Sequence, residues 1–251
     1  MGNVCTVESM GLLVFSDELD KIELSGSNKL VLTISPNSYG IATKDSSFRE
    51  ALEKTDYLVL DGVYFGLAAL LMQGKVIKPN QGPHVFDYYI KKMNEVGGRV
   101  FFLGSTEETL EKIRKQAEAK YPNVQVETYS PPFKPVFSEE DNAVMLDRIS
   151  QFKPDVLFVG MTAPKQEKWA YEHREKIDAK VTCCVGAVFD WFAGNEKVIA
   201  PIWWKLRLAW LVRTINRPEI LKRYPCVGIF FWDLLLVLLR IKKEETVGRP
   251  A

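Results

Sequence analysis

Short apolar runs alternate with longer, helix-periodic segments along most of this chain. Six runs rich in branched and aromatic residues predict strands, at residues 29–34, 57–60, 99–103, 124–128, 155–159 and 181–185. The segments between them predict helices at residues 42–54, 84–96, 106–120, 138–151 and 165–178. This alternation is typical of βαβ units. We therefore expect an α/β fold, a Rossmann-like and mostly parallel sheet flanked by helices.

Small or polar residues directly follow several of the predicted strands. Because the carboxyl ends of parallel strands meet at one edge of a sheet, we expect these residues to line a single crevice. They are Ser35, Pro36, Asn37, Asp61, Gly62, Gly104, Ser105, Gly160 and Gly186. Asp61 could act there as a general base, or it could cap the helix that follows.

The segment from residue 153 to 169, KPDVLFVGMTAPKQEKW, combines a buried strand, a glycine stop and a helix start. The strand ends at Gly160, and the helix begins with Lys165, Gln166 and Glu167. Loop amides and the positive end of a helix dipole favour an anion at such a junction, where Gln166 can recognise hydroxyl groups or a base edge. An ordinary turn between strand and helix explains the same pattern, so this segment alone does not decide between the two.

The pattern changes near residue 196. Six basic residues face one acidic residue, Glu219, between Pro201 and Arg223, and three tryptophans lie among them; the basic residues are Lys205, Arg207, Arg213, Arg217, Lys222 and Arg223. Residues 226–239 follow as an apolar run broken only by Asp233. We accordingly divide the chain into an α/β domain, residues 1–195, and a basic, aromatic and helical appendage, residues 196–251.

The apolar run of the appendage is too short for a clean membrane crossing. A helix of this length spans about 21 Å, and the hydrocarbon core of a bilayer is ~30 Å thick. Basic residues, tryptophans and a short apolar run together favour a segment that lies on an anionic membrane surface. A helix packed in the protein core or in a dimer interface is the alternative.

Composition narrows the classes of function. The 251 residues carry a net charge of only +1, so we expect no general affinity for nucleic acid. The four cysteines form no CxxC pair, and Cys183 and Cys184 lie in a predicted strand, which favours reduced thiols in the cytoplasm over disulfides or a zinc site. The N-terminal residues lack the pattern of a signal peptide.

Several common catalytic patterns are missing from the sequence. It has no dinucleotide fingerprint after the first predicted strand, no P-loop, no nucleophile elbow and no DxD pair, and its only histidines are His84 and His173. We therefore expect neither a cofactor nor a metal site. The carboxylate of Asp61, with Ser35 and Asn37 on a neighbouring loop, remains as the candidate chemistry.

A series of motifs then occurs in a fixed order along the chain. They are SPN at 35–37, DG at 61–62, PPF at 131–133, VGMTAPKQEKW at 159–169, VGAVFDWFAGN at 185–195, APIWWKLRLAWLVR at 200–213 and RPEILKRY at 217–224. Together they resemble the WecG/TagA/CpsF family of bacterial glycosyltransferases, over residues 30 to 224.

The resemblance implies an inverting, metal-independent hexosyltransferase that works without a cofactor. Such an enzyme moves a hexose or N-acetylhexosamine from a UDP-sugar to a polyprenyl-diphosphate-linked sugar and forms a β-linkage. It acts peripherally at the cytoplasmic face of the plasma membrane, in the synthesis of teichoic acids, enterobacterial common antigen, capsules and other exopolysaccharides. The appendage would contact the anionic membrane surface.

The resemblance also implies roles for particular residues. Asp61 corresponds to the proposed base, and Ser35, Asn37, Gln166 and Asp190 correspond to residues of the substrate pocket, which we expect Gly104, Gly160 and Gly186 to complete. Arg213 and Arg223 match arginines thought to close over the diphosphate. A further arginine of the family falls at Ile220, and Arg217 is our candidate for its replacement.

Two departures and two alternatives limit this interpretation. Family members often carry an arginine, then a glycine and an aspartate, where this chain has Pro79, Gly82 and His84, so the donor sugar stays open. Another nucleotide-sugar enzyme such as an epimerase is disfavoured by the missing dinucleotide fingerprint. A non-catalytic membrane adaptor is disfavoured by the presence of Asp61, Asn37 and Gln166. The sequence leaves a homo-oligomer open.

Overall fold

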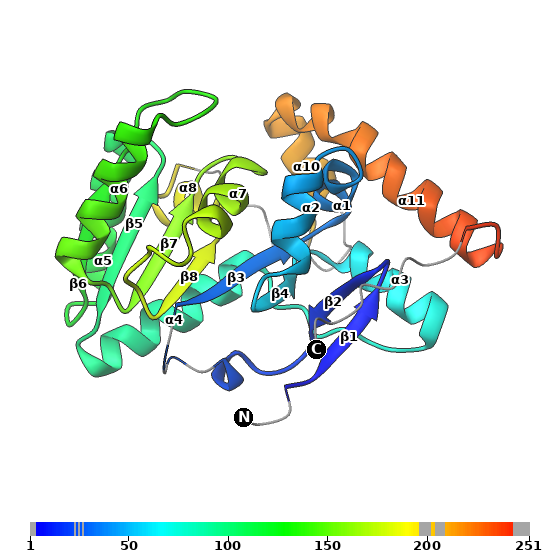
Figure 1. Cartoon of the computed structure of the whole chain (residues 1–251), viewed down its shortest axis with the longest axis horizontal. Helices are drawn as coiled ribbons and strands as arrows, with labels where there is room; N and C mark the ends of the chain where they lie inside the picture. The colour runs from blue at the N-terminus through cyan, green and yellow to red at the C-terminus, as the bar shows by residue number, and fades with distance from the viewer. Residues whose placement is uncertain are drawn as a thin grey trace.

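The computed structural model describes residues 4–22, 24, 26, 28–195, 202–203 and 209–242, except for the side chains of Val63, Ala209, Trp210, Arg213 and Glu219. Within these residues, eight strands form one sheet in the order β1-β2-β4-β3-β8-β7-β5-β6 (Figure 1). β1 and β2 pair antiparallel, and all other neighbouring strands run parallel. The prediction of an α/β fold with a mostly parallel sheet is therefore confirmed.

All six predicted strands are present, with boundaries shifted by at most one residue. They are β3 (Lys29–Ile34), β4 (Tyr57–Leu60), β5 (Arg99–Gly104), β6 (Gln125–Tyr129), β7 (Val156–Gly160) and β8 (Val181–Cys184). The hairpin of β1 (Thr6–Ser9) and β2 (Leu12–Phe15) was not predicted. Its strands have four residues each, which is too few for a clear periodic signal, and only pairing of Phe15 with Val59 of β4 attaches them to the parallel sheet.

Helices connect the parallel strands, and four of the five predicted segments correspond to single helices. These are α4 (Gly82–Val96), α5 (Glu107–Lys120), α6 (Glu139–Phe152) and α7 (Lys165–Glu172). The fifth, residues 42–54, is wrong in its boundaries, because the chain forms α1 (Pro36–Ala42) and α2 (Ser46–Glu53) instead. Ser35 and Asp45 each cap one of them by accepting a hydrogen bond from a backbone N–H, and Asp45 therefore starts a new helix.

Two further helices, α3 (Val63–Gln73) and α8 (Val188–Phe192), follow β4 and β8. Neither was predicted, because α3 is apolar all round and α8 has only five residues, so neither shows an amphipathic period.

The sheet is buried on both faces, as strands of a doubly covered sheet require. Alternate residues of each strand join different clusters: Leu30 and Leu32 pack with α2, α6 and α7, whereas Val31 packs with the opposite layer. That second layer consists of α4, α5 and α8, which contribute Phe86, Tyr89, Ile113 and Phe189 among others.

The C-terminal helices lie against the first layer (Figure 1). They are α10 (Ala209–Asn216), a 3-10 helix η2 (Pro218–Arg223) and α11 (Tyr224–Leu238). α11 packs on α1 and α3, where the fully buried ring of Phe230 stacks on that of Phe65 at a centroid distance of 5.3 Å. Among the described residues, no helix is long and apolar enough to span a membrane. The predicted domain boundary at residue 196 lies outside the described residues and stays a prediction.

Candidate active site at the carboxyl edge of the sheet

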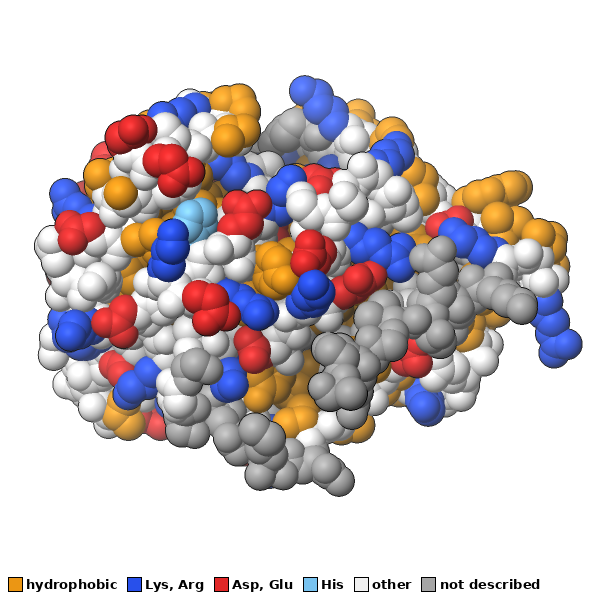
Figure 2. Space-filling model, in the orientation of Figure 1, with side chains coloured by type: hydrophobic (Ala, Val, Ile, Leu, Met, Phe, Trp, Pro, Cys, Tyr) orange, Lys and Arg blue, Asp and Glu red, His pale blue; other side chains and the backbone are white. Residues whose placement is uncertain are grey.

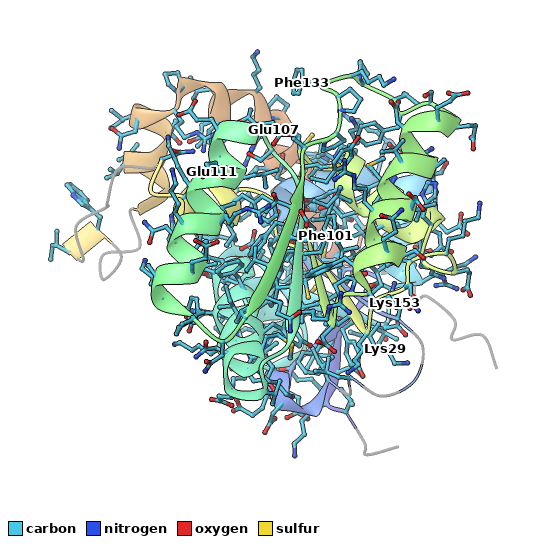
Figure 3. All side chains as sticks on the ribbon, turned by 90° about the vertical axis from the view of Figure 1, so that its left-hand side faces the viewer. Lys29, Phe101, Glu107, Glu111, Phe133 and Lys153 are labelled. Atoms are coloured by element: carbon cyan, nitrogen blue, oxygen red, sulfur yellow. The ribbon has the colours of Figure 1, made fainter. Side chains whose placement is uncertain are left out.

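The parallel strands end together at one edge of the sheet. Lys29 begins β3 and Lys153 precedes β7, and Figure 3 shows both at one end of the sheet. Glu107 follows β5 and Phe133 follows β6, and both lie at the other end. Register keeps the strand ends level, because Ile34 is paired with Leu60 and Gly104 with Gly160. β3 continues into α1 and α2 on one face of the sheet, whereas its neighbour β8 continues into α8 on the other face, so the two connections leave in opposite directions. Ligands bind at such switch points in open α/β sheets.

Backbone hydrogen bonding joins the loops that carry Asp61 and Ser35. The Asp61 N–H donates to the carbonyl of Ile34 at 2.8 Å, which places Asp61 beside the residue that precedes Ser35. Gly62, at φ 81°, is the N-cap residue of α3, so Asp61 stands one residue outside that helix. Ser35 accepts from the Ser38 N–H at 3.2 Å as the N-cap of α1, and Asn37 is the second residue of the same helix. Ser35, Asn37 and Asp61 are all half-buried.

Gln166 lies inside the protein and stabilises the loop after β7. Only 4% of it is exposed; its Oε1 accepts from the Met161 N–H at 3.2 Å, and its Nε2 donates to Oε1 of Glu167 at 2.8 Å. Gly186, at φ 54°, brings its backbone close to this amide, since a Cβ added there would lie 3.4 Å from Nε2 of Gln166. Gln166 and Gly186, both predicted site residues, are thus neighbours.

Glu167 was not predicted as a site residue. It is 2% exposed, and its second oxygen, Oε2, has no hydrogen-bond partner in the described structure. Burial raises the pKa of this carboxyl to about 7. A buried, incompletely satisfied carboxyl beside a candidate site is the kind of group that sequence patterns miss, because Glu at the start of a helix is ordinary.

The glycines at the ends of β5 and β7 have a packing explanation. A Cβ on Gly160 would lie 2.3 Å from the ring of Phe189, and one on Gly104, at φ 117°, would lie 2.6 Å from the Gly160 carbonyl oxygen. These glycines therefore permit α8 and two strand ends to approach each other. Substrate binding by Gly104 and Gly160 stays a prediction.

The appendage contacts this edge of the sheet through Arg217. Nη1 of Arg217, the N-cap residue of η2, lies 3.9 Å from Oδ2 of Asp190 on α8, and both side chains are about one-third exposed. Two residues predicted separately, one in each part of the chain, therefore form an ion pair. Arg223 lies exposed at the end of η2. The side chain of Arg213, and all of Lys205 and Arg207, lie outside the described residues.

Lys165 is partly buried, and Cys183 and Cys184 are fully buried. Lys165 donates to the carbonyl of Lys134 and lies over the ring of Phe137, and burial lowers the pKa of its amine. Cys183 and Cys184 are free and buried in β8, which raises the pKa of both thiols. In the described part of the chain, no three His, Cys, Asp or Glu side chains are grouped so that they could hold a metal ion.

The chain is similar in sequence to known proteins over most of its length. A sequence model described as "Glycosyl transferase WecG/TagA/CpsF family" matches residues 6–245. Two similar curated relatives, from Staphylococcus aureus strains MRSA252 and NCTC 8325 / PS 47, are both named N-acetylglucosaminyldiphosphoundecaprenol N-acetyl-beta-D-mannosaminyltransferase. Each is 27% identical over 221 residues, covering 88% of this chain and 85% of the relative. The family match spans nearly the whole chain and includes every motif described above, so the protein belongs to the WecG/TagA/CpsF family of glycosyl transferases.

Proposed function

We propose that this protein is an inverting glycosyltransferase that moves a hexose or N-acetylhexosamine from a UDP-sugar to a polyprenyl-diphosphate-linked sugar. The observation that carries the proposal is the hydrogen bond between the ends of β3 and β4, which sets Asp61 beside Ser35 at the switch point of the sheet. A half-buried carboxylate at the end of β4, on a loop that neighbours the one carrying Ser35 and Asn37, suits a base that acts on a sugar hydroxyl.

In this mechanism Asp61 takes the proton from the acceptor hydroxyl as its oxygen attacks the anomeric carbon of the donor sugar. The bond between that carbon and the UDP oxygen breaks, and UDP leaves with the bonding electron pair. Attack on the face opposite the leaving group inverts the anomeric centre, so an α-linked donor gives a β-linkage. The leaving diphosphate needs compensating positive charge, which we assign to Arg213, Arg217 and Arg223 without a metal ion, because guanidinium groups can bind phosphate oxygens bidentately.

The ion pair of Arg217 with Asp190 supports the participation of the appendage. It brings the cationic segment to the same edge of the sheet as Asp61 and Gln166. An incoming diphosphate would compete with Asp190 for the guanidinium. We therefore propose that Arg217 exchanges its carboxylate partner for the leaving phosphate, while Asp190 becomes available to hydroxyl groups of the substrate.

The name of the relatives supports a proposal for the class of acceptor, whereas the donor sugar of this protein stays open. Their name specifies an undecaprenyl-diphosphate acceptor carrying N-acetylglucosamine and transfer of N-acetylmannosamine. We propose the same class of acceptor for this protein and leave the donor sugar open, because Pro79 and His84 stand where family members often carry an arginine and an aspartate. The proposed location is the cytoplasmic face of the plasma membrane, with the residue 196–251 appendage docked on it.

A panel of UDP-sugars, assayed with a detergent-dispersed prenyl-diphosphate sugar, tests the proposal. We expect one UDP-hexose or UDP-N-acetylhexosamine to be transferred, with EDTA leaving the rate unchanged. Asp61→Asn should lower kcat by at least about a hundredfold with little change in donor KM, since a general base contributes about 10²–10⁴-fold. The control is Asp178→Asn, an exposed aspartate before β8 at the opposite end of the sheet, which should transfer at the wild-type rate.

Other outcomes would identify the alternatives. Interconversion of UDP-sugars without any acceptor would mean an epimerase, and binding of the lipid without turnover of any donor would mean an adaptor. A requirement for manganese would contradict the assignment of the arginines. Wild-type turnover by Asp61→Asn would remove Asp61 as the base.

A further inference from the structure

α3 and α11 each expose a stripe of apolar residues, and the two stripes meet beside the candidate active site. On α3, the exposed residues Tyr64, Leu67 and Leu71 recur at helical spacing, and on α11 Phe231, Leu235 and Leu238 do the same. The stripes meet where the rings of Tyr64 and Phe231 pack edge to face at 6.2 Å, directly outside the buried stack of Phe65 on Phe230. We call these six residues the α3–α11 face. Figure 2 shows apolar side chains gathered along the right-hand edge, over α11.

The α3–α11 face carries no charge. α3 contains no ionisable carboxylate or cation, and the single acid of α11, Asp233, is buried. Asp233 accepts from the Tyr39 hydroxyl at 3.0 Å and from the Lys242 ammonium at 2.9 Å, so it anchors α11 to α1 from the inner side. Exposed apolar residues are ordinary when they are scattered singly, but an uncharged group of them on two packed helices is typical of an interaction surface.

The charges around the face indicate what it binds. Lys222 and Arg223 lie exposed just before α11, and Arg240 lies exposed just after it. The fifteen residues of α11 span roughly 22 Å, so both basic ends can reach anionic headgroups only if the helix lies parallel to the bilayer surface. An uncharged apolar face between two cationic ends therefore fits an anionic lipid surface.

We propose that α3 forms one half of a bilayer-contacting surface and α11 the other. Membrane contact would then involve the α/β domain itself as well as the appendage. Because α3 begins two residues after Asp61, docking through α3 would hold the Asp61 strand end at the headgroup level. The membrane contact does not depend on sugar transfer. Its consequence, that a lipid-linked acceptor is presented to Asp61, rests on the proposed function.

Vesicle co-sedimentation of the full-length protein tests this inference. The probes are vesicles of phosphatidylcholine alone and vesicles with phosphatidylglycerol added. We expect wild type to bind the anionic vesicles, and Leu67→Asn combined with Leu71→Asn to reduce the bound fraction at least fivefold. The matched control is Val96→Asn combined with Val144→Asn, two exposed apolar residues on α4 and α6, which should bind as wild type does. Thermal melts of both double variants confirm that they fold.

Three results would overturn the proposal. The first is wild-type binding by the α3 double variant, which would leave α11 as the only contact. A second is equal binding to both vesicle types. The third is a self-associated wild type that the α3 substitutions dissociate, which would make the face a contact between copies of this chain. If the protein binds vesicles as expected but transfers sugar from no UDP-sugar, the proposed function is contradicted and the docking proposal still holds.

Discussion

Glu167 is the most buried carboxylate among the described residues, and one of its oxygens lacks a hydrogen-bond partner. It supports Gln166, whose amide in turn fixes the Met161 N–H at the end of β7. The neighbouring thiol of Cys184 is also buried, and its Sγ donates to the Gln166 carbonyl. Burial in such surroundings favours the protonated form of the acid.

The raised pKa of Glu167 predicts a stability change of definite sign. Its pKa is about 7 in the folded protein against 4.5 ordinarily, so the folded state retains a proton that the unfolded chain loses between these values. The contribution of Glu167 to stability is therefore fully present below pH 4.5 and is lost as pH rises through about 7, an effect of at most roughly 3 kcal/mol. The glutamine of Glu167→Gln cannot ionise. The free energy of unfolding of this variant should therefore rise relative to that of wild type as pH increases over this range.

Denaturant unfolding at a series of pH values between 4.5 and 8 measures this difference. Glu172→Gln, an exposed neighbour on the same helix, is the control and should track wild type throughout. Parallel curves for wild type and Glu167→Gln would mean that the Glu167 carboxyl ionises normally.

At the scale of elements, the contact between α1 and α11 depends on a glycine. A Cβ on Gly40 would lie 2.1 Å from the carbonyl oxygen of Cys226, so the backbones of the two helices touch at this point. α1 also carries Ser35 and Asn37 at its start, and Tyr39 bonds to Asp233. One short helix thus joins the candidate site to the appendage.

Gly40→Ala should therefore displace α11. Overpacking against a backbone costs about 1–3 kcal/mol, and the loss should concentrate in α11, where amide hydrogen exchange should accelerate. Gly228→Ala is the matched control on α11 itself. An added Cβ there meets nothing within 4 Å, so this change should be neutral or stabilise the helix by up to about 1 kcal/mol. Unchanged exchange in Gly40→Ala would contradict the close helix contact.

At the scale of the whole molecule, α11 shares a hydrophobic core with the α/β domain. Phe230 and Leu234 belong to the same buried cluster as Leu32 of β3 and Phe65 of α3. Removing the appendage would expose that cluster, so lost activity in a truncated chain could reflect lost packing. Point substitutions are the cleaner test of the appendage.

Phe230→Ala should lower the stability of the entire protein rather than of the appendage alone. Removing a fully buried phenylalanine costs about 3–5 kcal/mol, and we expect one unfolding transition, seen identically by circular dichroism and tryptophan fluorescence. Phe231→Ala, the half-exposed neighbour, should cost much less. Two separate transitions, with only one of them shifted by Phe230→Ala, would indicate an independent appendage.

The sequence by itself determined the class of fold, the parallel strands and the polar residues at their ends. Burial on both faces requires continuous apolar runs such as residues 155–159, and a strand that ends at Leu60 or Gly160 places the residues after it at the carboxyl edge of the sheet. Such patterns are local, so they can be read along the chain. Segments with no local period, such as α3, or too short to show one, such as the β1–β2 hairpin, could not be predicted.

Only the tertiary structure decided which of these residues meet. The ion pair of Arg217 with Asp190 spans 27 positions of sequence, the bond of Tyr39 to Asp233 spans 194, and Phe230 packs on Phe65 from the opposite end of the chain. It also decided that Glu167 is buried while Leu67 and Leu71 are exposed. Burial and long-range contact depend on how helices pack on the sheet, and that packing is set by the whole chain together.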